Sequence, residues 1–200
     1  MRIRFVVLAF LGAAVLAAAV AACAAPDGAA GRPGAPATSA ATRTTSTPAA
    51  ARRHPPREVI PVAKRQPAPA LRVTAFDGAT VTIDGFRGRV AVVNFFESWC
   101  PICMAEQPDL SQVAREFAGR AGFVGVSYHD TVAAGRAYQR RYAIAYPLAN
   151  DASGRTWARW RVPYQPVTVL VDPQGRVAAR YDGGATAGTL RTALQALLGE

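Results

Sequence analysis

The pattern of apolar and polar residues changes twice between residues 71 and 117. Alternation over residues 71–76 and 81–83, each run followed by an Asp-Gly pair, predicts a β-hairpin. Residues 90–96 are almost continuously apolar, as expected for a strand buried on both faces. Apolar side chains then recur at helical spacing in Leu110, Val113, Ala114 and Phe117. This part of the chain therefore predicts a hairpin, a central strand and a helix.

The remaining pattern predicts a second half of the same domain. Residues 123–126 predict a short central strand, and residues 132–142 an amphipathic helix. Residues 167–171 and 177–181 predict a hairpin, and leucines at helical spacing after residue 190 predict a closing helix. This order of elements predicts an α/β sandwich with a mixed sheet. Reactive groups in such sheets gather at the carboxyl ends of the strands.

The N-terminal segment has the features of an export signal. A short basic start precedes an uncharged apolar stretch that extends to residue 22. The stretch ends in Val20-Ala21-Ala22-Cys23, which resembles a bacterial lipoprotein processing box. We therefore expect residues 1–23 to be a signal peptide and Cys23 to be the lipidated first residue of the mature chain. A plain signal peptide or an uncleaved anchor are the alternatives, and all three place the folded part outside the cytoplasm.

A linker and a domain follow the signal. Residues 24–70 are rich in Ala, Pro, Thr, Gly, Ser and Arg and contain no aromatic residue, so we expect a disordered linker before a domain at residues 71–200. The formal net charge of +10 divides into +2 for the signal, +5 for the linker and +3 for the domain. Because a nucleic-acid-binding protein would concentrate its charge on the folded part, this balance argues against nucleic acid as a partner.

The candidate chemistry lies after the central strand, in Trp99-Cys100-Pro101-Ile102-Cys103. The domain contains these two cysteines and one histidine, His129, which are too few ligands for a structural zinc site. Haem attachment requires a histidine at position 104, which is Met. A structural disulfide that closes so short a loop adds little stability. We therefore expect a redox-active pair at a strand–helix junction, which uses no metal and no cofactor.

The two cysteines are expected to have different roles. If Cys100 caps the helix, its sulfur faces the unpaired N–H groups and the positive end of the helix dipole, which favours the thiolate and lowers its pKa. Cys103 lies one turn further along, less exposed, and would resolve the mixed disulfide. Pro101 at the first helical position leaves the N–H of Ile102 free to face the Cys100 thiolate. Trp99 would present a flat apolar surface beside that sulfur.

These residues resemble the extracytoplasmic thioredoxin-like family that includes TlpA, ResA and DsbE, and most closely its actinobacterial DsbE-like members. The resemblance covers residues 71–198 and is carried by Val93-Asn94-Phe95-Phe96, the Trp-Cys-Pro-Ile-Cys sequence, the Glu106, Pro108 and Leu110 that follow it, and the segment 160–168. It implies a thioredoxin-like three-layer sandwich with an N-terminal hairpin extension. Pro108 is expected to kink the first helix.

The resemblance also implies a substrate site around the cysteines. Pro166 should follow a cis peptide bond and lie against the sulfurs, and Gln165 should offer backbone hydrogen bonds to a bound peptide. We expect both residues to bind substrate together with Trp99, Pro101 and Ile102.

Two polar positions near the cysteines bear on proton transfer. Asn94 stands where cytoplasmic thioredoxin has a buried aspartate, which removes one candidate proton acceptor for Cys103. Glu97 is expected to be a solvated carboxylate at the end of the strand, with a proton relay as the alternative.

The Cys-Pro-x-Cys order is that of strongly oxidising DsbA-type proteins. We expect a membrane-anchored extracytoplasmic oxidoreductase that donates the Cys100–Cys103 disulfide to exported cysteine-containing proteins and is regenerated by a membrane redox partner. A reductase of the same family, for example in cytochrome c maturation, is the first alternative. A thioredoxin-fold copper chaperone that uses both cysteines and His129 is the alternative from another class. Exchanging Pro101 and Ile102 should make the disulfide less oxidising.

Overall fold

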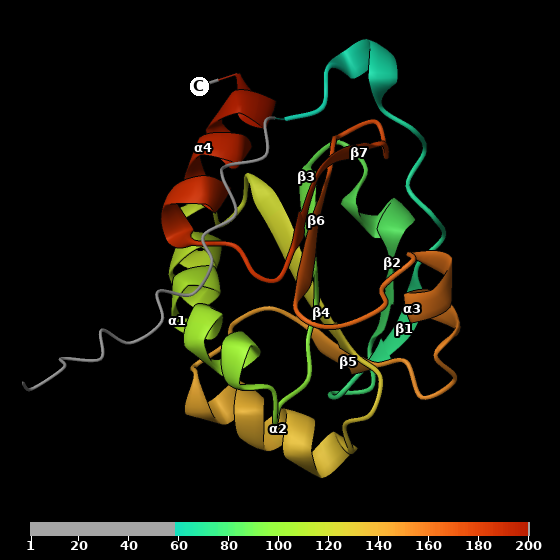
Figure 1. The fold of residues 1–200 in the computed structure, drawn as a ribbon, viewed down its shortest axis with the longest axis vertical. Coiled ribbons are helices and arrows are strands. Elements are labelled where there is room, and N and C mark those ends of the chain that lie inside the picture. The colour runs from blue at the N-terminus through green and yellow to red at the C-terminus, as the bar shows by residue number, and fades with distance from the viewer. Residues whose placement is uncertain (1–58, 200) are drawn as a thin grey trace, which may run out of the picture. The chain divides into compact units, whose positions relative to one another are not determined.

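The computed structural model describes residues 59–199 (Figure 1). Seven strands of this part form one mixed sheet in the order β2-β1-β5-β4-β3-β6-β7. The strands are β1 (Arg72–Ala75), β2 (Thr80–Thr82), β3 (Val90–Phe95), β4 (Ala121–Ser127), β5 (Leu148–Asn150), β6 (Val167–Val171) and β7 (Val177–Asp182). The three central strands β3, β4 and β5 are parallel, and the other pairings are antiparallel.

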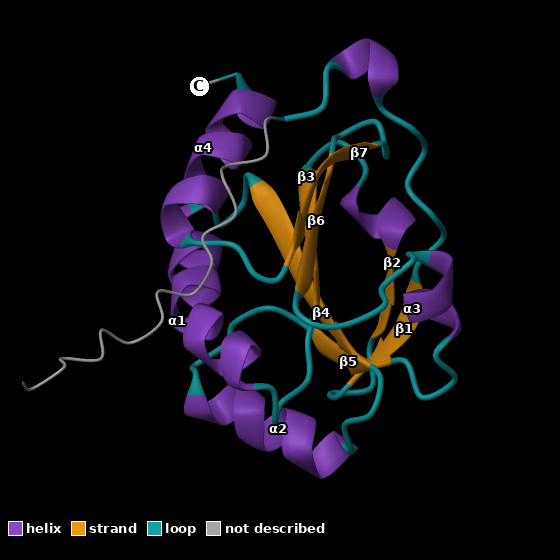
Figure 2. Ribbon diagram, viewed as in Figure 1, coloured by secondary structure: helices purple, strands orange, loops and turns teal. Residues whose placement is uncertain are grey.

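Helices cover both faces of this sheet. They are α1 (Pro101–Glu116), α2 (Val132–Arg141), α3 (Arg155–Arg159), α4 (Ala187–Leu198) and the short 3₁₀ helices η1 (Val62–Lys64) and η2 (Ile83–Phe86). Figure 2 shows α1 and α4 along one face of the sheet and α3 on the opposite side. The expected three-layer α/β architecture with an N-terminal hairpin is confirmed.

Strand β3 builds a core on each of its faces. Val90, Val92 and Phe96 pack with residues of α1, α2 and α4, whereas Val93 and Phe95 pack with the α3 side. Because side chains of a strand point alternately to opposite faces, a strand covered on both faces must be apolar at nearly every position. All six residues of β3 are buried, which explains the continuous apolar run in the sequence.

Two elements have no counterpart in the sequence pattern. Strand β5 has three residues, and its place depends on hydrogen bonds to β4 on one side and β1 on the other. Helix α3 has five residues, and its first turn is held by Asp151, which accepts the N–H groups of Thr156 and Trp157 at 2.7 and 3.0 Å. Neither element is long enough to show a hydrophobic period.

The ordered domain begins earlier than residue 71, so the expected linker boundary at residue 70 is wrong. The N–H of Ile60 donates to the carbonyl of Ala178 at 2.7 Å, and Pro67 forms a bridge with Arg176 beside β7. The guanidinium of Arg65 pairs with the buried carboxylate of Asp172 at 3.1 Å. Backbone and charge pairing hold this segment, and neither leaves a hydrophobic pattern in the sequence.

The expected signal, Cys23 and most of the expected linker lie outside the described residues. Between residues 59 and 199, no helix has the length and apolar character needed to cross a membrane.

Candidate active site

The sheet register brings the two cysteines to the edge where several strands end. Phe95 is paired with Val126 of the parallel strand β4 and with Val167 of the antiparallel strand β6. The carboxyl ends of β3 and β4 therefore meet the amino end of β6 at one edge. The cysteine-containing loop leaves β3 there, and Pro166 enters β6 at the same level.

Cys100 is the N-cap of α1, as expected. Its sulfur accepts the backbone N–H of Cys103 at 3.2 Å, and Pro101 occupies the first helical position. The sequence predicted the N–H of Ile102 as the donor to this sulfur, whereas the structure shows the N–H of Cys103 in that role. An N-cap side chain can reach the amide at either the second or the third helical position, and here it reaches the third. The Cys103 amide would be present in both orders of Pro101 and Ile102, so this bond gives no reason for the swapped order to be less oxidising.

Cys103 is held more deeply than Cys100. Cys103 is 1 % exposed and Cys100 is 4 % exposed. Burial raises the pKa of the Cys103 thiol strongly, with further contributions from the sulfur of Cys100 and the carboxyl of Glu106, while a hydrogen bond from the backbone of Glu97 lowers it. The hydroxyl of Tyr138 on α2 donates to the carbonyl of Cys103 at 3.0 Å, and its ring stacks on Phe96. The second cysteine is thus fixed from several sides.

The residues expected to contact substrate differ in their exposure. Trp99 and Ile102 are 58 % and 55 % exposed, and Pro101 is exposed as well. The peptide bond between Gln165 and Pro166 is cis, as expected; Gln165 is half-buried and Pro166 is buried.

Sequence reasoning missed Tyr164, an aromatic residue next to this loop that is 54 % exposed. Its signal was available, since an aromatic residue between two prolines of the expected substrate loop is well placed to contact substrate.

A buried carboxyl group, that of Glu106, lies behind the cysteines. It accepts hydrogen bonds from the side-chain amide of Asn94 at 3.1 Å and from the N–H of Ala185 at 3.0 Å. Asn94 also donates to the hydroxyl of Thr168 at 3.0 Å. Burial raises the pKa of Glu106 to about 7, against the two hydrogen bonds that lower it. Asn94 cannot itself accept a proton, but its side-chain amide holds the carboxyl of Glu106, which can.

Glycine is required where this carboxyl approaches the loop before α4. Gly184 has a φ of +107°, and a Cβ atom there would lie 2.9 Å from Oε2 of Glu106 and 3.7 Å from Cγ of Pro166. The same carboxyl therefore lies close to the loop before α4 and to the cis-proline. Sequence reasoning gave Glu106 no role, although a carboxylate on the apolar stripe of α1, three residues after Cys103, was a usable signal.

Glu97 is fully buried, which corrects the expectation of a solvated carboxylate at the strand end. Its Oε1 atom accepts the amide N–H groups of Tyr128 and His129. These partners come from the loop after β4, about 30 positions away in the sequence, so the local pattern did not reveal them.

The expected copper ligands are not brought together. Within residues 59–199, no group of three His, Cys, Asp or Glu side chains is arranged to hold a metal ion. His129 is exposed, and its ring packs against Tyr128 with 4.0 Å between the ring centroids. The structure therefore offers no support for a copper site at Cys100, Cys103 and His129.

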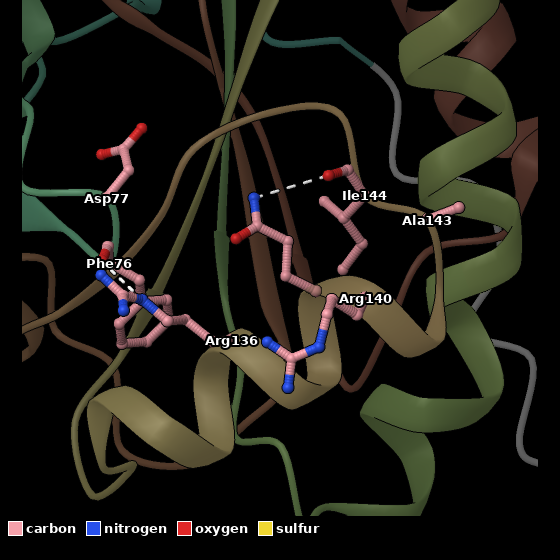
Figure 3. A pocket seen from close by; sticks show the side chains of 7 residues that line it. Phe76, Asp77, Arg136, Arg140, Ala143 and Ile144 are labelled. Carbon is pink, nitrogen blue, oxygen red and sulfur yellow. Dashed lines mark hydrogen bonds between the residues drawn. The ribbon is translucent and has the colours of Figure 1, made fainter. Parts of the chain in front are cut away.

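A pocket of about 430 Å³ lies between the turn after β1 and the C-terminal half of α2 (Figure 3). Its lining includes Phe76, Arg136 and Ile144 but none of the expected site residues. Arg136 donates to the carbonyl of Phe76, and Gly135 lets the Phe76 ring approach the helix backbone. We interpret this region as the junction that fixes α2, the helix that carries Tyr138.

Comparison with known proteins agrees with this geometry. Residues 65–180 match the AhpC/TSA family. The chain belongs to the AhpC/TSA family. Among its relatives, the soluble secreted antigen MPT53 of Mycobacterium tuberculosis is 38 % identical over 108 residues, which are 54 % of this chain and 59 % of the relative. The thiol:disulfide interchange protein DsbE of Allochromatium vinosum is 32 % identical over 52 % of this chain and 57 % of its own length.

A solved structure shows the same fold. It is that of a secreted Mycobacterium tuberculosis disulfide oxidoreductase homologous to Escherichia coli DsbE, with a TM-score of 0.59 and 32 % identity, and the match covers 64 % of this chain and 96 % of that one. The expected resemblance to DsbE-like proteins and the thioredoxin-like fold are confirmed. The chain spans less than two thirds of the length of the two curated relatives above.

The raised pKa of Glu106 predicts a pH dependence of stability. Between pH 4.5 and about 7 the folded chain retains a proton on Glu106 that the unfolded chain has lost. The free energy of unfolding of the reduced protein should therefore fall as pH rises through this window, by roughly 3 kcal/mol in total. Glu106→Gln cannot titrate and should remove this part of the slope, as measured by urea unfolding at a series of pH values.

The matched control for this experiment is Glu116→Gln. The pKa of Glu116 is lowered to about 2 by hydrogen bonds from Arg191 and Gln112, so Glu116 stays ionised throughout the window and its loss should leave the slope unchanged. Identical slopes for the wild type and Glu106→Gln would show that Glu106 is not the titrating group.

Proposed function

We propose that this chain is an extracytoplasmic protein thiol-disulfide oxidoreductase that exchanges the Cys100–Cys103 disulfide with exported cysteine-containing proteins. The observation that carries the proposal is the first turn of α1, where the sulfur of the capping Cys100 accepts the amide of Cys103 while Cys103 is buried beneath it. This arrangement supports an entering role for Cys100 and a resolving role for Cys103. The disulfide oxidoreductase names of the relatives support the same chemistry.

The exchange needs only the two sulfurs and a substrate thiol. A substrate thiolate attacks the sulfur of Cys100, the Cys100–Cys103 bond breaks, and Cys103 leaves with the electron pair and takes up a proton. A second substrate thiolate then attacks the substrate sulfur of the mixed disulfide and releases Cys100. Two electrons pass from the substrate dithiol to the protein. The pair itself is the redox centre, so this reaction involves no metal and no other cofactor.

The surface around Cys100 supports a polypeptide substrate. Trp99, Pro101 and Ile102, which stand next to or near Cys100 in the sequence, are exposed apolar residues. Gln165 and Pro166 lie at the same edge of the sheet, where the backbone of Gln165 would bind an extended segment that contains the substrate cysteine. Apolar contacts of this kind favour partly folded exported proteins over compact ones.

We further propose that the domain is attached to the outer face of the cell membrane through a lipid on Cys23. The apolar N-terminal stretch and the processing box support export and lipidation, and the relative named as a secreted antigen supports a location outside the cytoplasm. A membrane redox partner near this anchor would restore the disulfide after each turnover.

Oxidation is the direction that we favour. Disulfides form and persist outside the cytoplasm, and the Cys-Pro-x-Cys order is that of strongly oxidising proteins. The contrary direction, reduction of substrate disulfides, uses the same two sulfurs in the reverse sequence of steps.

Trapping tests the exchange itself. In Cys103→Ser, Cys100 should form mixed disulfides with exported proteins that persist, because no second sulfur resolves them. Gels run without reductant should show these adducts, which should disappear with reductant and be absent from Cys100→Ser. Adducts of equal amount in both variants would contradict the assignment of Cys100 as the entering sulfur.

The reduction potential tests the direction. Trp99 is next to Cys100 and exposed, so its fluorescence should report the state of the pair in glutathione buffers, and Trp99→Phe should remove the signal. An oxidant should give a potential nearer the value of about −120 mV typical of DsbA. A value close to thioredoxin's, about −270 mV, would favour the reductase.

Metabolic labelling tests the anchor. Cells that express the full chain should incorporate radioactive palmitate into it, and Cys23→Ala should abolish the incorporation while leaving the folded domain intact. Equal labelling of both chains would contradict lipidation at Cys23.

A further inference from the structure

The guanidinium group of Arg180 on β7 binds two successive carbonyl groups of the segment between α3 and β6. Nη1 donates to the carbonyl of Trp160 at 2.9 Å, and Nη2 donates to the carbonyl of Arg161 at 2.9 Å. Nε donates to the carboxylate of Asp182, also on β7, at 2.9 Å. We call these three hydrogen bonds the arginine clamp. Because a guanidinium group is planar and its donors have fixed directions, the clamp holds both carbonyl groups at once.

The clamp acts on a turn with an unusual backbone conformation. Arg161 has a φ of +52°, in the left-handed region that residues with a Cβ atom seldom adopt. Trp160 just before it is fixed by the core, because its ring lies 5.6 Å from the ring of Phe95 and its Nε1 donates to the carbonyl of Ala70 at 3.3 Å. Arg180 therefore secures the chain at the point where it leaves α3.

The other end of the same segment is held from the end of β7. The N–H of Gly183 donates to the carbonyl of Pro166 at 2.8 Å. Asp182 is paired with Val167, the first residue of β6. The end of β7 and the glycine after it therefore hold the segment from residue 161 to residue 166 at both ends.

Residues 163–165 lie between these two attachments and are open to a partner. Pro163 and Tyr164 are exposed, and Gln165 is half-buried. Within residues 59–199, no hydrogen bond uses the backbone of these three residues. The N–H groups of Tyr164 and Gln165 and the carbonyl groups of all three can therefore pair with an extended peptide. The exposed ring of Tyr164 adds an aromatic surface beside them.

We propose that Arg180 is a positioning residue for peptide substrates, because the arginine clamp fixes the segment whose residues 163–165 pair with an extended peptide. This inference rests on the proposed thiol-disulfide exchange. The segment enters β6 at the sheet edge from which the Cys100 loop leaves β3. A segment that is ordered before binding loses less conformational entropy when the peptide binds, so the clamp strengthens peptide binding without altering the chemistry of the sulfurs.

The test compares a peptide with a small dithiol. Full-length chain carrying Cys23→Ala is purified in detergent in its disulfide form. It is then mixed with dithiothreitol or with a short synthetic peptide that carries two reduced cysteines among apolar residues. In both reactions two electrons pass from the dithiol to the Cys100–Cys103 disulfide. Acid quenching, maleimide labelling of free thiols and mass spectrometry give the rate of this reduction over a range of dithiol concentrations.

The expected effect is confined to peptide binding. Arg180→Ala should raise the half-saturating peptide concentration roughly tenfold, as expected when hydrogen bonds from a charged group are lost. The maximal rate with the peptide and the rate with dithiothreitol should each change by less than about twofold, because the clamp acts on binding.

Two further variants show whether the clamp itself is required. Arg180→Lys keeps the positive charge but cannot reproduce the planar fork, so it should give an intermediate half-saturating peptide concentration. This milder change also keeps the test open if Arg180→Ala does not fold. Arg191→Ala removes an arginine of α4 that pairs with Glu116 at the surface, and should match the wild type with both dithiols.

Three results would overturn the proposal. The first is a wild-type half-saturating peptide concentration in Arg180→Ala. The second is a wild-type value in Arg180→Lys, since charge alone would then be sufficient. The third is a loss of equal size with the peptide and with dithiothreitol, because that pattern indicates a general effect on the fold or on the cysteines. Failure of the wild-type disulfide to react with either dithiol would instead overturn the proposed function.

Discussion

The hydrogen bond from the amide of Cys103 to the sulfur of Cys100 fixes the geometry on which the rest of the site depends. Because the sulfur of Cys100 caps α1, the helix begins at Pro101, a few residues after the end of strand β3 at Phe95. Pro101 fits there because the first helical amide has no partner within the helix. The bond also sets the distance between the two cysteines along one helical turn. A strand buried on both faces and a helix docked on one of them leave the loop between them little freedom.

The same docking places the two sulfurs in different surroundings. Cys100 is 4 % exposed and is a close sequence neighbour of the exposed residues Trp99 and Ile102. Cys103 lies within the first turn of α1, where the hydroxyl of Tyr138 donates to its carbonyl. Burial disfavours the charged form of a thiol, so the resolving sulfur needs local donors before it can act as a thiolate. The greater burial of Cys103 fits the resolving role that we propose for it.

Much of this arrangement could be predicted from the sequence, because the patterns were long or the chemistry was restrictive. The apolar run of β3 predicted a strand covered on both faces. The domain has too few cysteines and histidines for a structural zinc site or haem attachment, so a redox role remained for the two cysteines. The burial of Glu97 could not be predicted, since its partners Tyr128 and His129 are brought to it only by the pairing of β3 with β4. The segment before residue 71 was missed for a similar reason, because Arg65 finds Asp172 only across the folded sheet.

The buried carboxyl group of Glu106 bears on the redox chemistry in a way that the order of Pro101 and Ile102 does not reveal. The amide that reaches the Cys100 sulfur belongs to Cys103 and would be present in either order. What varies with conditions is the charge on Glu106, whose pKa of about 7 places its titration near neutrality, close enough to Cys103 to raise the pKa of that thiol. An ionised Glu106 repels a thiolate on Cys103 and so disfavours the reduced form in which Cys103 is ionised. A protonated Glu106 has no such effect. Protonation of Glu106 therefore removes one of the charges that raise the pKa of the Cys103 thiol.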